Sequence, residues 1–545
     1  MIDLFKKRPL LLIISVVAVL MLPFLDVMEV TIMEARNFIT AREMLTDDTW
    51  ILTTMNGEAR YQKPPLPTWL TALSAMVFGV KSIWGLRLPA VVMVMLLGSM
   101  VYTLSRKLTL HKSHSLYNGL IGVTSLYVIL IVFEAPWDIY AHTFMLVGVY
   151  SIVQLFTTKG IPWKYVLLAV LGIGGSVLSK GPVSAYALLL PFLISYGIIF
   201  RKSTTRKKWT TLVGALVVGL ALGFSWYIYV RYADPETFKA ITSKETGNWT
   251  SYNVRPFYYY WSFFTQSGVW TIPAFIGLLY PYLKTRVSNL KVYQFTLLWT
   301  LLVVVLLSVI PEKKSRYLMP VLIPLAMNTG FYIEYLLRRF KELTDKRETI
   351  PVYFAFGVIG LAFVGAAVAS IYLLFTETSI EIPVLPYVFA GVLCAIGVLL
   401  LKKLYQKSIE GVIMLLIVGL MALVYSLGPL HAKNKVVSRD HFAFDGFFKG
   451  LNIEDTTPIY AYKNTSPEMV WARGSKIPVI ESLSELEEGT TFYVIDNKIF
   501  EESLEKDENI HSFMYEAPYL IDLNYEGSDH KNRKMGYVYK LIKQE

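Results

Sequence analysis

Long apolar runs alternate with short polar loops along most of the chain. About thirteen of these runs approach the roughly 20 residues that a helix needs to cross a hydrocarbon core about 30 Å thick. They lie near residues 9–25, 83–104, 116–133, 137–156, 163–178, 183–200, 209–230, 257–282, 291–310, 317–337, 351–375, 384–402 and 411–429. The pattern predicts an α-helical integral membrane protein with about 13 transmembrane helices.

Basic residues gather in alternate loops between these runs. The first run follows Lys6, Lys7 and Arg8 and has no small-residue cleavage site, so we expect a retained anchor with a cytoplasmic N-terminus. The positive-inside rule then places every second loop in the cytoplasm. The opposite face receives a long first loop at 26–82, a loop near 231–256, several short turns and the tail after residue 430, and we expect function there.

The first external loop, residues 26–82, is too polar to span a membrane and too patterned for a simple linker. A Ser/Thr-x-x-Glu capping box runs from Thr31 to Glu34 and is followed by apolar residues at helical spacing. This predicts an amphipathic helix along the membrane surface over about residues 31–45. After a run of prolines, a second helix is predicted over 68–78.

The composition changes abruptly near residue 431, where Asp, Glu, Lys, Asn and Ser become frequent. A helical stretch is expected at 500–506, and the β-like runs are 458–462, 477–480, 492–495 and 537–542. We therefore predict two domains. Residues 1–430 form a transmembrane domain, and residues 431–545 form a small α/β domain outside the membrane.

Composition agrees with a membrane protein, because 54% of the 545 residues are hydrophobic and only 17% are charged, against about 25% charged in soluble domains. The single cysteine, Cys394, excludes an intrachain disulfide and a cysteine zinc site. The formal charge of +11 resides in short loops, so we attribute it to membrane topology and expect no nucleic-acid partner.

The residues from Met33 to Gly79 resemble the first periplasmic loop of polyprenyl-phosphate-sugar-dependent glycosyltransferases with the GT-C fold, especially the lipid A aminoarabinose transferase and protein O-mannosyltransferase group. Further matching segments are Leu178-Ser179-Lys180-Gly181-Pro182, Arg255-Pro256-Phe257-Tyr258-Tyr259-Tyr260 and Lys314-Ser315-Arg316-Tyr317-Leu318-Met319-Pro320. The resemblance implies a glycosyltransferase in the bacterial inner membrane, with its active site and C-terminal domain extracytoplasmic. Its donor would be a polyprenyl-phosphate sugar, and its acceptor a lipid, protein or glycan.

Two positions depart from the family pattern. Where relatives have Asp-Glu, this chain has Met33-Glu34, so one acid of the pair is missing. Where the aminoarabinose transferases have Glu before Lys-Pro-Pro, this chain has Gln62. The resemblance implies that this glutamate helps to hold a divalent metal in the relatives, so Gln62 argues against a metal here without excluding one, and we assign no metal ligand.

Sugar transfer from a lipid phosphate requires an acceptor for the proton of the incoming hydroxyl and cations for the departing phosphate. Glu34 is the candidate base, although its capping box alone would explain it. Asp138 is the second catalytic candidate, because it resembles a second family carboxylate that would orient the first or raise its pKa, although an acid in the first turn of a helix also interacts favourably with the helix dipole.

Five basic residues at the expected external face are candidates for binding the donor phosphate, namely Arg36, Lys63, Lys180, Lys314 and Arg316. Each one alone is equally explained by an interaction with lipid head groups. Four tyrosines are candidates for lining the substrate site, although an aromatic belt at the membrane interface explains them as well; they are Tyr61, Tyr258, Tyr259 and Tyr317.

A lipid or solute transporter, or flippase, is the main alternative from another functional class. Transporters place ionisable residues near the bilayer midplane, within paired broken helices. Here the ionisable residues lie at the ends of the apolar runs, which favours chemistry at the membrane surface. A structural anchor would need only one span.

Overall fold

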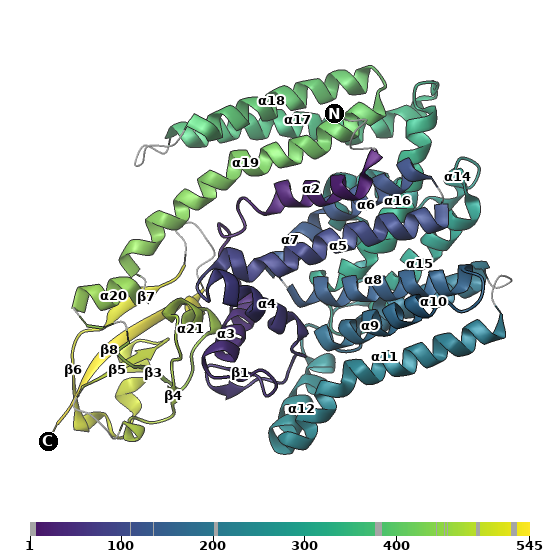
Figure 1. Cartoon of the computed structure of the whole chain (residues 1–545). Coiled ribbons are helices and arrows are strands. Elements are labelled where there is room, and N and C mark those ends of the chain that lie inside the picture. The colour runs from purple at the N-terminus through teal and green to yellow at the C-terminus, as the bar shows by residue number, and fades with distance from the viewer. Residues whose placement is uncertain are drawn as a thin grey trace. The chain divides into compact units, whose positions relative to one another are not determined.

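The computed structural model describes residues 7–109, 111–134, 136–200, 205–376, 384–442, 444–451, 453–454, 456–486, 491–524 and 531–544 (Figure 1). The chain divides into two compact units, which are described separately. The helical unit comprises Met1–Leu25, Tyr61–Leu70 and Arg87–Leu427. The loop–sheet unit comprises Asp26–Arg60, Thr71–Leu86 and Gly428–Glu545. The division into domains at residue 430 stays a prediction.

Most of the apolar runs form helices. These are α2 (Pro9–Met21), α5 (Ile83–Thr109), α6 (Lys112–Thr124), α7 (Leu126–Glu134), α8 (Pro136–Thr157), α9 (Trp163–Lys180), α10 (Leu190–Phe200), α11 (Arg206–Ala233), α15 (Leu290–Val309), α16 (Met319–Arg339), α17 (Lys346–Thr376), α18 (Val384–Tyr405) and α19 (Ile409–Phe442). Among the described residues, seven helices are long and apolar enough to cross a membrane, or up to eight if α6 and α7, which are bent by 42°, form one span. The thirteen-helix count is therefore not confirmed, because several runs form shorter or broken helices.

The run at 257–282 is not the continuous span that the sequence predicts. It folds into η3 (Phe257–Tyr260), η4 (Phe263–Trp270), α13 (Thr271–Gly277) and α14 (Tyr280–Leu283). Gly268 adopts φ 65°, a backbone conformation outside any right-handed helix, within η4. Pro256 immediately precedes η3, and Pro281 lies in the first turn of α14. A proline lacks the backbone N–H that a continuing helix requires.

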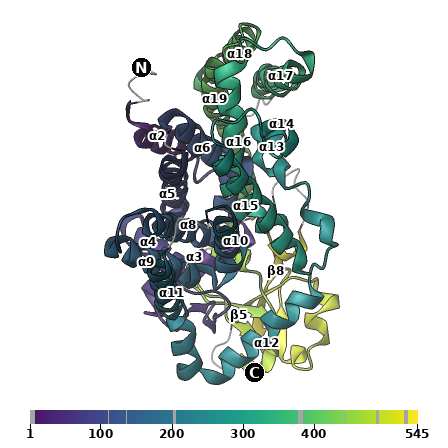
Figure 2. The same ribbon diagram turned by 90° about the vertical axis from the view of Figure 1, so that its right-hand side faces the viewer.

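Within the helical unit, α9 packs between α8 and α11, and Figures 1 and 2 both show these helices side by side. Helix α16 packs against α6 and α15, and α17 packs against α18. The helix α12 (Pro235–Ser251) follows α11 directly in the expected external loop. Helices α8 and α9 pack antiparallel, so the first turn of α8 lies beside the last turn of α9. Several candidate residues lie there.

The loop–sheet unit contains the helix predicted near 31–45, observed as α3 (Ile32–Thr46), and its place along the membrane surface stays a prediction. The predicted capping box is present, with the Thr31 N–H donating to Glu34 Oε2 at 3.0 Å and the Glu34 N–H donating to Thr31 Oγ1 at 3.3 Å. A hairpin follows, made of β1 (Thr54–Met55) and β2 (Glu58–Ala59). The second predicted helix is α4 (Leu66–Phe78), which the two units share.

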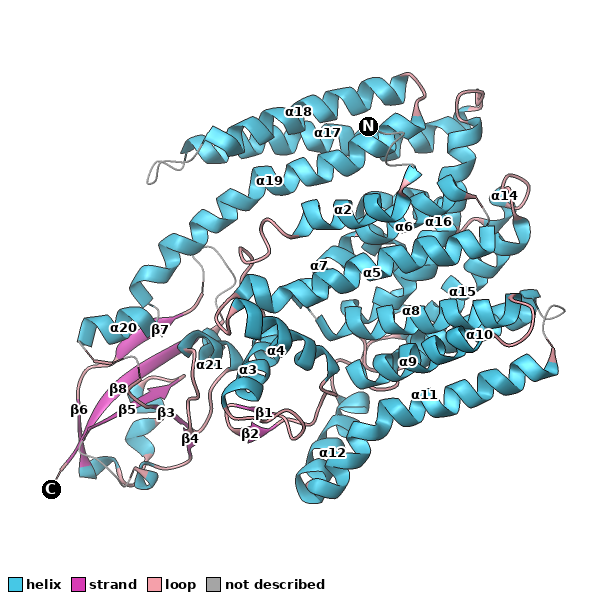
Figure 3. Cartoon of the chain, viewed as in Figure 1, coloured by secondary structure: helices cyan, strands magenta, loops and turns pink. Residues whose placement is uncertain are grey.

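The C-terminal segment forms a small sheet, and Figure 3 shows its strands in magenta. The order is β4-β3-β5-β8-β6, with β7 also paired to β8. The strands are β3 (Ile459–Tyr462), β4 (Val479–Ile480), β5 (Thr491–Asp496), β6 (Phe513–Tyr515), β7 (Tyr519–Asp522) and β8 (Met535–Lys543). The four predicted β runs correspond to β3, β4, β5 and β8. The stretch at 500–506 forms two 3₁₀ turns, η7 (Phe500–Glu502) and η8 (Leu504–Lys506), instead of the predicted helix.

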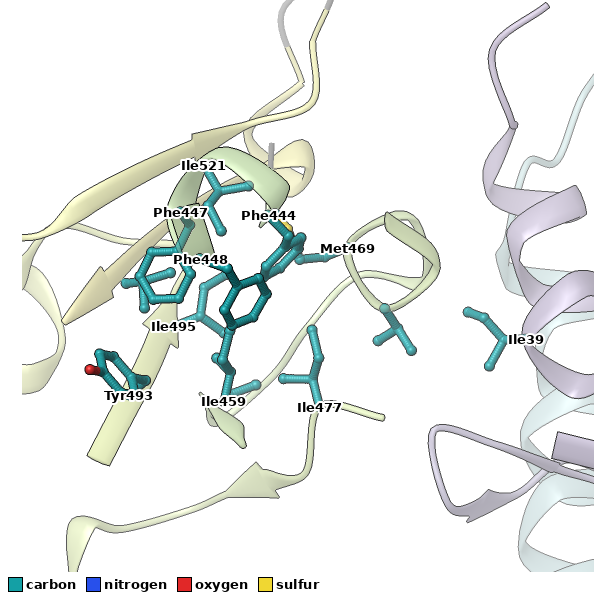
Figure 4. Close-up of a cluster of buried hydrophobic side chains, with 13 residues drawn as sticks. Ile39, Phe444, Phe447, Phe448, Ile459, Met469, Ile477, Tyr493, Ile495 and Ile521 are labelled. Atoms are coloured by element: carbon teal, nitrogen blue, oxygen red, sulfur yellow. The ribbon is translucent and has the colours of Figure 1, made fainter. Parts of the chain in front are cut away.

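One face of this sheet shares its apolar core with the first loop. Two helices, α20 (Phe444–Leu451) and α21 (Pro467–Arg473), contribute to the core. Figure 4 shows Phe444, Phe447 and Phe448 gathered near Ile459, and the same cluster includes Ile39 of α3. Phe38 of α3 also packs against Trp471 of α21, with ring centroids 5.2 Å apart. Residues far apart in the chain therefore bury one common apolar surface.

Candidate functional site

The centre of the candidate site in the helical unit is an ion pair between Asp138 and Lys180. Asp138 lies in the first turn of α8, and Lys180 is the last residue of α9. Lys180 Nζ donates to Asp138 Oδ1, and both side chains are almost fully buried. Gly181 follows with φ 70°, so the chain turns away directly after the lysine. The other carboxylate oxygen, Asp138 Oδ2, is also buried and accepts no hydrogen bond within the described part of the chain.

A histidine and a serine extend this pair into the helical unit. His142 Nε2 lies 3.8 Å from Asp138 Oδ1, one helical turn along α8. Its other ring nitrogen, Nδ1, is 2.8 Å from Ser184 Oγ, and both side chains are buried. Ser184 immediately precedes a π-helical turn, Ala185–Leu189, and such turns often occur at functional sites. Together the buried groups form the chain Lys180–Asp138–His142–Ser184.

Tyr317 brings three cations together around one aromatic ring. Its ring centroid lies 5.1 Å from Lys180 Nζ, 5.6 Å from Lys314 Nζ and 5.8 Å from the Arg316 guanidinium. Its hydroxyl donates to Glu312 at 3.1 Å. The cluster joins three of the five cations predicted from the sequence.

The loop that carries Lys314 is held by hydrogen bonds to η3 and to the segment just before it. Val254 and Glu312 form an antiparallel bridge, and the Tyr260 hydroxyl bonds both the N–H and the carbonyl of Lys314 at 3.0 and 3.1 Å. Lys314 Nζ also pairs with Glu312 at 2.6 Å. Buried Lys313 donates to the carbonyls of Arg255 and Ile310. These bonds hold the loop rigidly beside Tyr317.

The other tyrosines lie in different surroundings. Tyr258 is two-thirds exposed, and the Tyr259 hydroxyl lies 3.4 Å from Ser315 Oγ. Tyr61 donates to Asp234, the residue that caps α11, at 3.0 Å. Burial and this hydrogen bond raise the pKa of Tyr61 to about 12. Lys63, two residues later, is half-buried.

Two candidate residues belong to the loop–sheet unit. Glu34 is fully buried and is held in the capping box at the start of α3. Arg36 lies two residues further along α3, where its Nη1 contacts the Met33 sulfur at 4.0 Å and its carbonyl accepts a hydrogen bond from Arg60. The structural interpretation of Glu34 as a capping residue is therefore observed, and its catalytic role stays a prediction.

The residues around Gln62 do not fit a divalent metal. Gln62 offers one neutral amide oxygen, which is buried and accepts no hydrogen bond from the described residues. Within those residues, no group of three or more His, Cys, Asp or Glu side chains is close enough to hold an ion. Metal sites for Mg²⁺ or Zn²⁺ use several anionic or imidazole ligands. We therefore derive no chemical step through a metal.

Sequence reasoning did not find His142, Ser184 or Glu312. The spacing of four residues between Asp138 and His142 was a signal, because such residues share one helix face. Glu312 lies two residues before Lys314, which is close enough for a local ion pair. Nothing in the sequence signalled Ser184, which reaches His142 only through the packing of the helices.

Parts of the sequence are similar to known proteins. Residues 62–228 match the family described as dolichyl-phosphate-mannose-protein mannosyltransferase. An uncharacterised protein of Aquifex aeolicus is 26% identical over 347 residues, covering 62% of this chain and 64% of its own length. An undecaprenyl phosphate-alpha-4-amino-4-deoxy-L-arabinose arabinosyl transferase of Proteus mirabilis is 24% identical over 348 residues, covering 61% of this chain and 60% of its own length. The chain thus spans less than two thirds of these relatives.

The similarity to solved structures extends over nearly the whole chain. The ArnT protein of Cupriavidus metallidurans bound to undecaprenyl phosphate superposes with a TM-score of 0.67 over 97% of both chains, at 15% sequence identity. The same protein in its apo state superposes with a TM-score of 0.69, at 14% identity. These comparisons confirm the predicted resemblance to GT-C glycosyltransferases of the aminoarabinose transferase and mannosyltransferase type.

Proposed function

We propose that the protein is a membrane glycosyltransferase that transfers a sugar from a polyprenyl phosphate to a hydroxyl or phosphate of a lipid A, protein or glycan acceptor at the extracytoplasmic face of the bacterial inner membrane. The observation that carries the proposal is the gathering of Lys180, Lys314 and Arg316 around Tyr317. The shared fold with a protein solved in complex with undecaprenyl phosphate supports a lipid-phosphate donor.

The cation cluster suits the departing phosphate. Arginine binds phosphate oxygens through parallel hydrogen bonds, and lysine supplies a compact positive charge. Within the described residues, Lys314 pairs with Glu312 and Lys180 pairs with Asp138, whereas Arg316 has no ion pair. A guanidinium that is not engaged in an ion pair can bind a phosphate anion through two parallel hydrogen bonds. We assign the same role to Lys63 and Arg36.

The reaction that we propose is a single inverting displacement. The acceptor oxygen forms a bond with the anomeric carbon of the sugar while the bond between that carbon and the phosphate oxygen breaks. The bonding electron pair leaves with the polyprenyl phosphate, which the cations stabilise. The proton of the acceptor hydroxyl passes to a carboxylate, which we assign to Glu34. Asp138 holds Lys180 in position, and its buried Oδ2 accepts no hydrogen bond from the described residues.

Mass spectrometry of lipids extracted from gently purified protein tests the donor. We expect a glycosylated polyprenyl phosphate to be enriched with Glu34→Gln protein, because that variant binds the donor without consuming it. The double variant Lys314→Gln/Arg316→Gln should lose this lipid. If both proteins carry only bulk phospholipid, the proposed donor is wrong and the transporter hypothesis is favoured.

Sugar transfer by Glu34→Gln tests the base. A matched control is Glu58→Gln, since Glu58 is exposed in the adjacent hairpin. General-base catalysis contributes about 10²–10⁴-fold, so we expect a loss of that size for Glu34→Gln and normal turnover for the control. Near-normal turnover by Glu34→Gln would show that another group accepts the proton.

A further inference from the structure

Arg42 is a buried cation with unsatisfied donors. It lies near the end of α3, in the loop–sheet unit, and only 6% of its surface is exposed. Its two terminal amines, Nη1 and Nη2, are both buried and have no hydrogen-bond partner within the described part of the chain. A buried charged group without partners is costly, because it has lost its hydration and gained nothing in exchange.

Two acids, Glu43 and Asp47, act on Arg42 through their charges, but neither accepts a hydrogen bond from its Nη groups within the described residues, and both have other partners. Glu43 accepts hydrogen bonds from the hairpin, namely from Thr54 Oγ1 at 2.6 Å and from the N–H of Asn56 at 2.6 Å. Asp47 pairs with Lys476 at 2.7 Å. Glu43 and Asp47 therefore bind the hairpin and the C-terminal segment. The two Nη groups of Arg42 have no hydrogen-bond partner among the described residues and can bind another anion.

A second arginine adds positive charge at the same place. Arg473 ends α21, which packs against α3. Its Nη2 donates to the Thr457 carbonyl at 3.1 Å, and its guanidinium lies 4.5 Å from the Phe448 ring centroid. Burial, and also the charge of Arg473, lowers the pKa of Arg42, whereas the charges of Glu43 and Asp47 raise it. Two cations are thus held close together inside one unit.

We propose that Arg42 and Arg473 form a binding site for a phosphate or carboxylate group, enclosed between α3 and α21. The two Nη groups of Arg42 match the two oxygens of such an anion in a bidentate arrangement. The site consists of loop–sheet residues alone and does not depend on the proposed glycosyltransferase activity. Because both amines are buried, a covering side chain must move before an anion enters. Once bound, the anion is only weakly screened by salt.

The test is thermal unfolding of the full chain in a phosphate-free detergent. Sodium phosphate, sodium acetate and sodium chloride are compared at constant ionic strength and pH. A ligand that binds only the folded state raises the unfolding midpoint, and we expect about 2–4 °C for wild type in phosphate or acetate relative to chloride. Arg42→Gln should lose this shift. The control Lys540→Gln, which removes a half-buried charge paired with Glu516 in the same unit, should keep it.

A second arm identifies the source of the anion. Dihexanoyl phosphatidic acid carries a lipid phosphate, and dihexanoyl phosphatidylcholine is the matched lipid whose phosphate is shielded by choline. A shift with inorganic phosphate indicates a small free anion. A shift with phosphatidic acid alone indicates a lipid head group, and both results support the site. Equal midpoints for wild type in all these solutions would overturn the proposal.

A further variant covers the case in which Arg42→Gln does not fold. Arg42→Lys keeps the charge and removes the bidentate fork. We expect it to fold and to bind phosphate about tenfold more weakly than wild type, because one of two parallel bonds is lost. Unchanged phosphate affinity in Arg42→Lys would contradict the bidentate site.

Discussion

Lys180 and Asp138 form an ion pair whose side chains are only 10% and 2% exposed. Removing one member of a buried pair leaves an uncompensated charge, at a cost of about 3–5 kcal/mol, whereas replacing both members is much less costly. We therefore expect Lys180→Met to lower the free energy of unfolding by about 3 kcal/mol. The double variant Lys180→Met/Asp138→Asn should recover most of that loss. Thermal unfolding of the three proteins measures this, and additive losses would contradict it.

Ser184 fixes the ring of His142 through one hydrogen bond. Ser184→Ala leaves the ring nitrogen without a partner, and we expect a loss of about 1–3 kcal/mol in the free energy of unfolding. Ser195→Ala is a matched control, since buried Ser195 bonds only the Pro191 carbonyl of its own helix. Denaturant unfolding of both variants provides the measurement. Equal stabilities would show that the bond to His142 contributes nothing.

The Tyr317 ring should matter more than its hydroxyl for donor binding. Tyr317→Phe keeps the ring and loses only the bond to Glu312, so we expect less than about fivefold weaker donor binding. Tyr317→Leu loses the three cation–π contacts, each worth about 0.5–1 kcal/mol, and should weaken binding by about 10–100-fold. Titration of a polyprenyl phosphate into each variant gives the affinities. Equal effects of the two substitutions would exclude a role for the ring.

Asp507 should make the protein sensitive to acid. Burial raises the pKa of this carboxyl. Hydrogen bonds from the N–H groups of Asn509 and Leu483 and from the Tyr462 hydroxyl together lower the pKa by more than burial raises it, so it lies below the usual range. A carboxyl whose pKa is depressed in the folded state stabilises the protein above its unfolded value, about 3.9, and this stabilisation is lost as the pH falls through the folded pKa.

We therefore expect the unfolding midpoint to decrease as the pH falls from about 5 to about 2. Asp507→Asn should be less stable at neutral pH and should show a smaller decrease on acidification. The control Glu516→Gln, at an exposed position, should follow wild type. An identical pH profile for wild type and Asp507→Asn would contradict the assignment.

Asn56 should hold the hairpin to the C-terminal segment. Its side chain donates to the Ile477 carbonyl at 2.7 Å and accepts from the Ile477 N–H at 2.8 Å, and its own backbone has φ 60°. Asn56→Gly tolerates that backbone conformation and removes both side-chain bonds, so we expect a loss of about 1–3 kcal/mol. Limited proteolysis should cut the hairpin faster in this variant than in wild type, and an unchanged rate would contradict the role.

Sequence patterns that involve residues close together in the chain predicted the structure correctly. The capping box from Thr31 to Glu34 predicted the start of α3, because its bonds join residues only three apart. The run at 257–282 was misinterpreted because its composition is apolar throughout, while the conformation of Gly268 and the prolines breaks the helix. Hydropathy reports the environment of a segment and not its continuity.

The sequence predicted individual residues of the site but not which of them lie close together in space. Lys180, Lys314 and Arg316 were each expected at helix ends, but their meeting around Tyr317 depends on how three chain segments pack. Ser184 was missed because its partner lies 42 residues away. Arg42 was not noticed because an arginine within an amphipathic helix is ordinarily exposed, and its burial arises only when the C-terminal segment covers it.

The pairing of Asn56 with Ile477 joins residues 421 positions apart. At a synthesis rate of about 5–20 residues per second, the first loop leaves the ribosome on the order of 20–80 s before its partner exists. During that time the C-terminal members of the buried cluster that includes Ile39 have not been synthesised. Biogenesis of this protein therefore includes an interval in which α3 exists before the C-terminal residues that share its buried cluster have been synthesised.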